Sequence, residues 1–432
     1  MTCDHQPRQG TIPACIAAVI VVLVAAPASS WASLCGNAVV DPNEVCDGGT
    51  ASCSSLGESY TGGTASCRAD CSGWNVSTCT RAGSPEIVKP NFRYDTKYPD
   101  ALCNNGTPYG FYVRMASSPS AKWMIYLEGG GYCDDVSKMC DDRLANRPEL
   151  TKELSGGDRT LVASLPLGGI GSSDSSVNPD FYNVNQVYMQ YCSSDMWSGT
   201  SASTQTTTAG SWYFAGHANF DATIDMLIAY YGLDDKNPNT KVLLTGGSAG
   251  AFGVHFNASR AAGRLPTAFG AGRLLLFVDT GWYINWADLS YTLGGSGLLD
   301  YDVWAAARDF WTGTWDAVCE SMVTDPVKCI YGSYWSTYLA NAGYPLLVEQ
   351  SRQDSKFMIG DHGLLPSDAD AAAWRTMEQN TLNNVRWLFS GVAPHHTLAD
   401  SDTGFATVGG SWVLRDVVHF FWVGGPPIHD MY

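Results

Sequence analysis

Ser248 stands at the centre of the segment Lys241-Val-Leu-Leu-Thr-Gly-Gly-Ser-Ala-Gly-Ala-Phe-Gly253, where a serine hydroxyl can act as a nucleophile. The apolar run Val242–Thr245 predicts a strand, and the small residues after Ser248 predict a helix. A Gly-x-Ser-x-Gly turn between two such elements is typical of a nucleophile elbow, in which the serine occupies a strained turn above the sheet edge. Side chains at Gly246 and Gly250 would collide where strand and helix nearly touch. The pattern predicts a serine that takes part in acyl transfer.

Acyl transfer also needs hydrogen-bond donors for the oxyanion. The strand-like run Trp123–Leu127 opens after Glu128 into three glycines, whose N–H groups can approach a substrate without interference from Cβ atoms. A glycine triplet alone is compatible with a simple turn, but its combination with Ser248 favours an oxyanion hole. We expect Gly130, Gly131 and the N–H of Ala249 to form it.

The serine further needs a base and an acid that orients the base, in the chain order Ser, Asp or Glu, His. Asp279 ends one predicted strand, and Asp354 follows the next strand along the chain. The usual position of the acid is on the penultimate strand, which favours Asp354 without excluding Asp279. The adjacent residues His395 and His396 follow the last predicted strand and are the candidates for the base.

The elements that must position these residues alternate between strands and helices. Such alternation predicts an α/β fold of the α/β-hydrolase type, with a mainly parallel central sheet and helices on both faces. The predicted strands are Gly110–Arg114, Lys122–Leu127, Gln186–Gln190, Lys241–Thr245, Arg273–Val278, Leu346–Gln350 and Arg386–Ser390, and the predicted helices include Ala218–Tyr231 and Ala371–Asn384.

The amino-terminal segment and the net charge indicate export and limit the possible partners. Ala14–Ala26 is a run of 13 apolar residues, too short to span a bilayer comfortably but typical of a signal peptide. We expect cleavage near Ala32, and an uncleaved membrane anchor is the alternative. Residues 1–32 are therefore expected to leave the mature chain, which then has no membrane span. The net charge of −17 argues against nucleic acid or an anionic membrane as a partner.

Fourteen cysteines fit an exported chain, and Cys3 and Cys15 leave with the signal peptide. Six of the other twelve lie in a short segment rich in Gly, Ser, Thr and Asp, which predicts a disulfide-stapled module over residues 33–82, of a connectivity that spacing leaves open. Zinc binding by these cysteines is disfavoured because the segment has no histidine. Its carboxylates are alternatively a calcium site or solvated loop charge. The cysteines are Cys35, Cys46, Cys53, Cys67, Cys71 and Cys79, and the carboxylates are Asp41, Glu44, Asp47 and Asp70.

Two resemblances follow from these motifs. The first module resembles Cys-rich modules on secreted proteins of myxobacteria. Residues 83–432 resemble the pectin acetylesterase family, which includes the Notum-type carboxylesterases. The blocks that carry this resemblance are Cys103-Asn-Asn-Gly-Thr-Pro-Tyr-Gly-Phe-Tyr, Leu127-Glu-Gly-Gly-Gly-Tyr-Cys133, Tyr191-Cys-Ser-Ser-Asp-Met-Trp-Ser-Gly199, Gly246-Gly-Ser-Ala-Gly250 and Asp279-Thr-Gly-Trp282.

The family resemblance assigns roles to residues. It implies that Asp354, nine residues after Pro345, is the acid and that Asp279 is a pocket residue beside Trp282. It implies that His396, next to Thr397, is the base, with His395 as the alternative. It also implies disulfides Cys103–Cys192 and Cys133–Cys140, which leave Cys319–Cys329 as the remaining pair.

The resemblance implies a secreted serine carboxylesterase that removes acyl groups, most plausibly acetyl groups from a polysaccharide such as pectin, without metal or cofactor. The alternatives are a fatty-acyl esterase or protein O-deacylase of Notum type and a non-catalytic secreted binding protein. The net charge of −17 would repel polygalacturonate unless salt or calcium screens it. Tyr132, Trp197, Trp282 and Tyr283 are expected to wall the substrate pocket.

Overall fold

The computed structural model describes residues 35–90, 98–153, 171–283, 300–351 and 397–401. Within these ranges, positions 43, 136, 137, 173, 177, 179, 180, 201–203, 208 and 209 are outside the description. The predicted signal peptide, Asp354 and the pair His395 and His396 lie outside the described residues. The same holds for the strand predicted over 386–390 and the helix predicted over 371–384.

The described part of the chain alternates strands and helices along most of its length. The strands are β1 Thr50–Ser52, β2 Tyr60–Gly62, β3 Thr64–Cys67, β4 Trp74–Asn75, β5 Thr80–Arg81, β6 Glu86–Val88, β7 Phe111–Arg114, β8 Lys122–Leu127, β9 Asn185–Met189, β10 Gln205–Thr207, β11 Gly210–Trp212, β12 Lys241–Gly247, β13 Leu274–Asp279, β14 Leu346–Ser351 and β15 Thr397–Ser401. The helices are α1 Cys53–Leu56, α3 Cys140–Asn146, α4 Gly216–Tyr230, α5 Ala249–Phe256, α6 Ala258–Arg264, α7 Pro266–Gly270, α8 Asp300–Phe310, α9 Ala317–Met322 and α10 Gly332–Asn341, with 3-10 turns η1 Pro148–Leu150 and η4 Pro326–Ile330.

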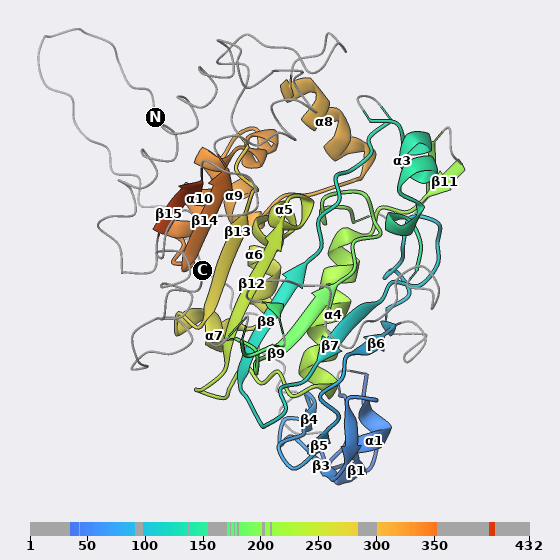
Figure 1. Cartoon of the computed structure of the whole chain (residues 1–432), viewed down its shortest axis with the longest axis vertical. Coiled ribbons are helices and arrows are strands. Elements are labelled where there is room, and N and C mark those ends of the chain that lie inside the picture. Colours follow the sequence, from blue (N-terminus) through green and yellow to red (C-terminus); the bar gives the residue numbers. More distant parts are fainter. Residues whose placement is uncertain are drawn as a thin grey trace, which may run out of the picture.

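The central sheet has the strand order β15-β14-β13-β12-β8-β9-β7-β6 (Figure 1). The six strands from β15 to β9 run parallel, and β7 and β6 complete one edge in antiparallel pairing. The α/β-hydrolase fold with a mainly parallel sheet, expected from the alternating pattern, is therefore confirmed.

The strands at the centre of the sheet are apolar on both faces. In β12, Val242, Leu243 and Leu244 in succession are at most 1% exposed, and β13 is buried from Leu274 to Val278. Strands buried on both faces read as continuous apolar runs because both faces are covered. For this reason the sequence predicts these strands to within two residues at either end.

β15 differs from expectation. It directly follows the histidine pair, where the sequence predicts no strand, with Thr397 opposite Leu347 and Ser401 opposite Ser351. The strand predicted over 386–390 lies outside the described residues. The segment escaped the sequence analysis because Asp400 and Ser401 are residue types that are scarce in strands.

The amino-terminal module is held by disulfides Cys35–Cys71, Cys46–Cys67 and Cys53–Cys79. A sulfur in a disulfide offers no thiolate, so these six residues are not zinc ligands as described. Of the carboxylates considered for calcium, Asp47 accepts from the amides of Gly36 and Asn37, and Asp70 pairs with Lys236.

The module packs against the end of the hydrolase domain that lies away from α5 (Figure 1). The Tyr60 hydroxyl donates to the carbonyl of Tyr230, at 3.3 Å, at the end of α4, and Arg68 donates to the carbonyl of Leu233. A Cβ atom at Gly73 would lie 2.5 Å from the carbonyl oxygen of Ile228, so the two backbones are in close contact. The module therefore rests on the domain by direct packing, remote from Ser248.

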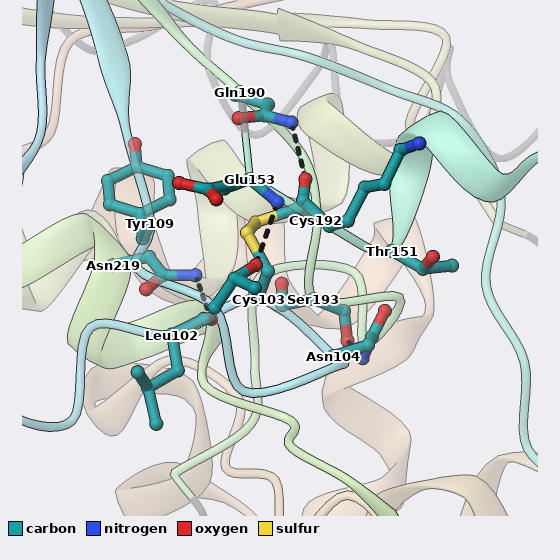
Figure 2. The surroundings of a disulfide bond; sticks show 12 residues. Leu102, Cys103, Asn104, Tyr109, Thr151, Glu153, Gln190, Cys192, Ser193 and Asn219 are labelled. Atoms are coloured by element: carbon teal, nitrogen blue, oxygen red, sulfur yellow. Dashed lines mark hydrogen bonds between the residues drawn. A yellow bond between two sulfur atoms is a disulfide. The ribbon is translucent and has the colours of Figure 1, made fainter. Parts of the chain in front are cut away.

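Three disulfides staple the hydrolase domain, and all three pairings named from the sequence are confirmed: Cys103–Cys192, Cys133–Cys140 and Cys319–Cys329. Figure 2 shows the first of them, which joins the loop before β7 to the loop after β9. Around it, the Asn219 side chain of α4 donates to the carbonyl of Leu102 at 3.0 Å. This disulfide and its hydrogen bonds fix the base of the loops described next.

Candidate active site

Ser248 occupies the strained turn that the sequence predicts. Its φ of 55° and ψ of −125° lie in a region that residues with a Cβ atom rarely adopt. Its amide donates to the carbonyl of Asp279 and to the hydroxyl of Thr280, both at 3.1 Å. The turn is therefore hydrogen-bonded to the carboxyl end of β13. Ser248 is exposed although Ala249 and Gly250 are buried. The elbow therefore presents the hydroxyl at the carboxyl edge of the sheet.

Glycine is required around the elbow because three backbone segments meet there. A Cβ atom at Gly250 would lie 2.0 Å from the carbonyl oxygen of Leu127, and one at Gly246 would lie 2.6 Å from the carbonyl oxygen of Gly250. Both separations are too short for real Cβ atoms. The Gly-x-Ser-x-Gly pattern is thus explained by contact between β12, the start of α5 and the end of β8.

The glycine loop, residues 129–131, lies against the same turn. A Cβ atom at Gly129 would lie 2.4 Å from the carbonyl oxygen of Gly247 and 3.1 Å from the Cβ of Ser248. Gly130 and Gly131 have φ values of 144° and 73°, which only glycine adopts readily. The structure therefore brings together Ser248 and the glycines expected to donate to an oxyanion.

The amides of Gly130, Gly131 and Ala249 make no hydrogen bond to another group in the part of the chain that the structure describes. Ala249 is the first residue of α5, where backbone N–H groups have no partner within the helix. Backbone amides without an internal partner beside a serine hydroxyl are what an oxyanion hole requires. The arrangement has the chemistry of acyl transfer.

The block Tyr191–Gly199 supports the elbow from beneath. The carboxylate of Asp195 accepts from the amides of Trp197, Gly199 and Gly216 and from the hydroxyl of Ser193, at 2.6–3.0 Å. Burial raises the pKa of Asp195 to about 6, against these hydrogen bonds, which favour the carboxylate. The sequence analysis missed this residue as an organising group, although it stands inside the most specific motif of the chain.

Trp197, one of the expected pocket residues, is fully buried. Its indole donates to the carbonyl of Glu128 at 3.0 Å, and its ring stacks on Tyr191 with centroids 5.5 Å apart. A Cβ atom at Gly253 of α5 would lie 2.5 Å from this ring. In the structure Trp197 supports the elbow helix and the start of the glycine loop.

A chain of aromatic rings extends from the glycine loop to the elbow helix. Tyr132 lies 5.1 Å from Trp304 of α8, Trp304 lies 5.2 Å from Tyr283, and Tyr283 lies 6.4 Å from Phe252 of α5, between ring centroids. Trp282 packs beside them against Trp335, at 5.6 Å. Trp304 carries no motif in the sequence that would have singled it out.

Of the two candidate acids, the structure describes only Asp279. Asp279 is the last residue of β13, next to the strand that carries Ser248, and its register partner is Gly247. Its neighbourhood includes Tyr126, whose pKa burial raises to about 12, with further contributions from the charges of Asp279 and Glu128. Asp354 comes three residues after the end of β14, two strands from Ser248, but lies outside the described residues.

The neighbourhood of the candidate bases is described only from Thr397 onward. Thr397 is opposite Leu347, near the amino end of β14, whereas Ser248 follows the carboxyl end of β12. The strand β14 has six residues, so the two edges lie about 20 Å apart. His395 and His396 themselves lie outside the described residues.

Two further features concern the described helices and two buried histidines. No helix in the described ranges is long and apolar enough to cross a membrane. His217 and His255 are fully buried away from Ser248's hydroxyl, since His217 bonds Asn257 and Thr314 and His255 stacks on Trp335 at 4.4 Å. Neither is placed to serve as the base.

Comparison with known proteins places the chain among esterases. A family model described as "PAE: Pectinacetylesterase" matches residues 84–386, a range that contains the glycine loop and Ser248 and stops before His395. The human palmitoleoyl-protein carboxylesterase NOTUM is 29% identical over 314 residues, which cover 70% of this chain and 57% of the human protein. The Drosophila melanogaster enzyme of the same name is 33% identical over 236 residues, covering 53% of this chain and 33% of that protein.

Solved structures agree with the sequence comparison. The Wnt deacylase Notum from Drosophila superposes with a TM-score of 0.58 at 25% identity, over 73% of this chain and 83% of that one. The chain spans between about one third and somewhat more than half of the length of the curated relatives it matches.

Proposed function

This chain belongs to the pectinacetylesterase family, and from that premise we propose that it is a secreted serine carboxylesterase that removes O-linked acyl groups. The observation that carries the proposal is the exposed Ser248 in its strained turn, with the amides of Ala249 and the glycine loop beside it. Acyl transfer uses these parts together.

The proposed reaction has two steps. His396, oriented by Asp354, takes the proton of the Ser248 hydroxyl while Oγ attacks the ester carbonyl, and the amides of Gly130, Gly131 and Ala249 bind the oxyanion. The protonated base then gives its proton to the leaving alcohol, which leaves an acyl-serine. Water, deprotonated by the same base, attacks the acyl-serine and releases the carboxylic acid and free Ser248.

The acid is assigned to Asp354 by the family resemblance and by strand order, since it follows the strand two places from β12. Asp279 holds the elbow through its backbone carbonyl, which a side-chain substitution leaves in place. Asp354→Asn is expected to lower kcat by about four orders of magnitude, and Asp279→Asn by less than tenfold. Loss of activity in Asp279→Asn with Asp354→Asn nearly intact would reverse the assignment.

The base is assigned to His396 by the family resemblance, with His395 as the alternative. Single substitutions His395→Ala and His396→Ala, assayed with the same ester, decide between them. If both variants keep kcat within threefold of the wild type, the base is elsewhere in the chain.

A non-catalytic binding protein on the same scaffold is the opposing reading. A fluorophosphonate probe labels a serine only where a base and an oxyanion hole activate it. We expect labelling of the intact protein and none of Ser248→Ala. An unlabelled, folded wild type would refute the esterase.

The acyl group is assigned to acetyl on a polysaccharide such as pectin, following the family description. The names of the curated relatives favour a second candidate, a fatty-acyl group on a protein. A series of nitrophenyl esters, run beside acetate release from acetylated pectin, separates the two. A maximum at C2 with pectin turnover supports the deacetylase, and a maximum at C8 or longer supports the fatty-acyl esterase.

Export is part of the proposal. Residues 1–32 have the character of a signal peptide, and six described disulfides suit an oxidising compartment. Mass determination of the protein from a secreting host tests this, with a new amino terminus expected near residue 33.

A further inference from the structure

Arg143 is a buried cation beside the glycine loop, outside every motif considered above. It belongs to α3 and is 8% exposed. Arginine is rarely buried to this extent unless its donors are bonded. The hydrogen-bond partners of the Arg143 side chain must therefore explain why it is buried.

The guanidinium of Arg143 contacts two segments, the glycine loop and the block Tyr191–Gly199. Nη1 donates to the carbonyl oxygen of Gly130 at 2.7 Å, and Nε donates to the hydroxyl of Ser194. The face of the guanidinium lies over the Tyr191 ring, 5.5 Å from its centroid. A planar fork that reaches a carbonyl, a hydroxyl and an aromatic face is held in one orientation.

Ser194 is itself anchored to the disulfide region. Its hydroxyl donates to Asn104 Oδ1 at 2.5 Å, and the Asn104 amide group donates to the carbonyls of Ser193 and Tyr213 at 2.8 and 2.7 Å. Asn104 and Ser193 directly follow the two cysteines of the disulfide in Figure 2. Arg143 thus connects the disulfide-linked segments to the glycine loop, whose three glycines restrict the backbone little by themselves.

The contact with Gly130 determines where the next amide points. The peptide bond between Gly130 and Gly131 is trans, so its C=O and N–H point in opposite directions. Arg143 holds the C=O on its own side through the hydrogen bond from Nη1. The N–H of Gly131 therefore faces away from Arg143.

We propose that Arg143 is a positioning residue for the oxyanion hole, which fixes the Gly130–Gly131 peptide so that the Gly131 N–H is available to the substrate oxyanion. The proposal rests on the proposed esterase function. Two glycines with positive φ have little intrinsic preference for one peptide orientation. Without the guanidinium, this peptide is free to rotate and the donor is lost for part of the time.

The test is Arg143→Lys, which keeps the positive charge but lacks the fork that reaches both acceptors. Loss of one oxyanion donor lowers kcat by about 10²–10³-fold, and partial misorientation should lower kcat by roughly 10–100-fold with KM within about threefold. Arg143→Ala should regain activity when guanidinium is added at millimolar concentration, whereas added ammonium should not restore it.

Arg273→Lys is the matched control. Arg273 Nη1 also holds backbone carbonyls, those of Asn237 and Thr240 at 3.0 and 2.6 Å, but at the start of β12, the opposite end from Ser248. This variant should keep kcat within twofold. If Arg143→Lys and Arg273→Lys have equal kcat, or if the loss in Arg143→Lys equals its loss of folded protein, Arg143 has only a structural role.

A crystal structure of Arg143→Lys tests the proposal independently of turnover. We expect the Gly130–Gly131 peptide to be rotated or to occupy two orientations. A single, unchanged orientation would overturn the proposal even if activity fell. If the wild type hydrolyses no ester, the esterase function fails, and this crystallographic comparison still decides whether Arg143 orients the peptide.

Discussion

Substitution of Gly129 by alanine should separate the glycine loop from the nucleophile. The new Cβ would lie 2.4 Å from the carbonyl oxygen of Gly247 and 3.1 Å from the Cβ of Ser248. A carbon and a carbonyl oxygen normally stay about 3.3 Å apart, so the loop must move away from the elbow by roughly 1 Å. A misplacement of about 1 Å at a reacting centre costs about 10²-fold in rate. We therefore expect kcat to fall about 100-fold, which corresponds to about 2.7 kcal/mol in the barrier.

Initial rates with nitrophenyl acetate and thermal unfolding are measured on the same preparations of Gly129→Ala. The matched control is Gly263→Ala on α6, where a Cβ atom meets nothing within 4 Å. Since alanine is favoured over glycine within a helix by about 0.5–1 kcal/mol, the control should keep its activity and unfold at the same or a higher temperature. A folded Gly129→Ala protein with kcat within threefold of the wild type would refute the reasoning.

Two further predictions concern stability. Burial, together with the charge of Arg260, lowers the pKa of His217 to about 3, whereas a histidine in an unfolded chain titrates near 6.5. Between these values the unfolded state binds the extra proton, so the free energy of unfolding falls as the pH decreases. Relative to His217→Gln, the wild type should lose about 1.6 kcal/mol between pH 6.5 and 5, measured by urea unfolding; equal pH dependence of the two proteins would contradict a neutral buried histidine. Replacing both Cys103 and Cys192 by serine should cost about 4.5 kcal/mol, since the pair is 89 residues apart. The same change at Cys133 and Cys140, seven residues apart, should cost about 2.5 kcal/mol, and a larger cost there would contradict the loop-entropy argument.

The site shows how a short motif depends on distant parts of the chain. Ser248 is recognisable in the sequence because its glycines are a local requirement of the turn. Its support comes from Asp195 and Trp197, about fifty residues earlier, and from the carbonyl of Asp279 after it. The motif identifies the candidate nucleophile, and contacts with distant segments hold its backbone in place.

Burial argues against a pocket-lining role for several aromatic residues that the sequence places in the substrate pocket. Trp197, Trp282 and Tyr283 are at most 2% exposed, and Trp197 contacts the elbow helix rather than open space. Residue type and proximity to a motif do not distinguish a ring that lines a pocket from one that packs beneath it. That distinction depends on the direction of the side chain, which only the packed structure gives.

Residue patterns alone predict the class of fold and the core strands of this protein, and they single out Ser248 as the candidate nucleophile. Continuous apolar runs such as Val242–Leu244 encode burial on both faces of a sheet, and the glycines around Ser248 encode close contact of backbones. These are local properties, which a single stretch of residues carries. The tertiary structure alone decided that Arg143 holds the carbonyl of Gly130, that the disulfide module packs on the end of α4, and that β15 pairs with β14. Each of these depends on the approach of segments remote in sequence, and no local pattern records which partners meet.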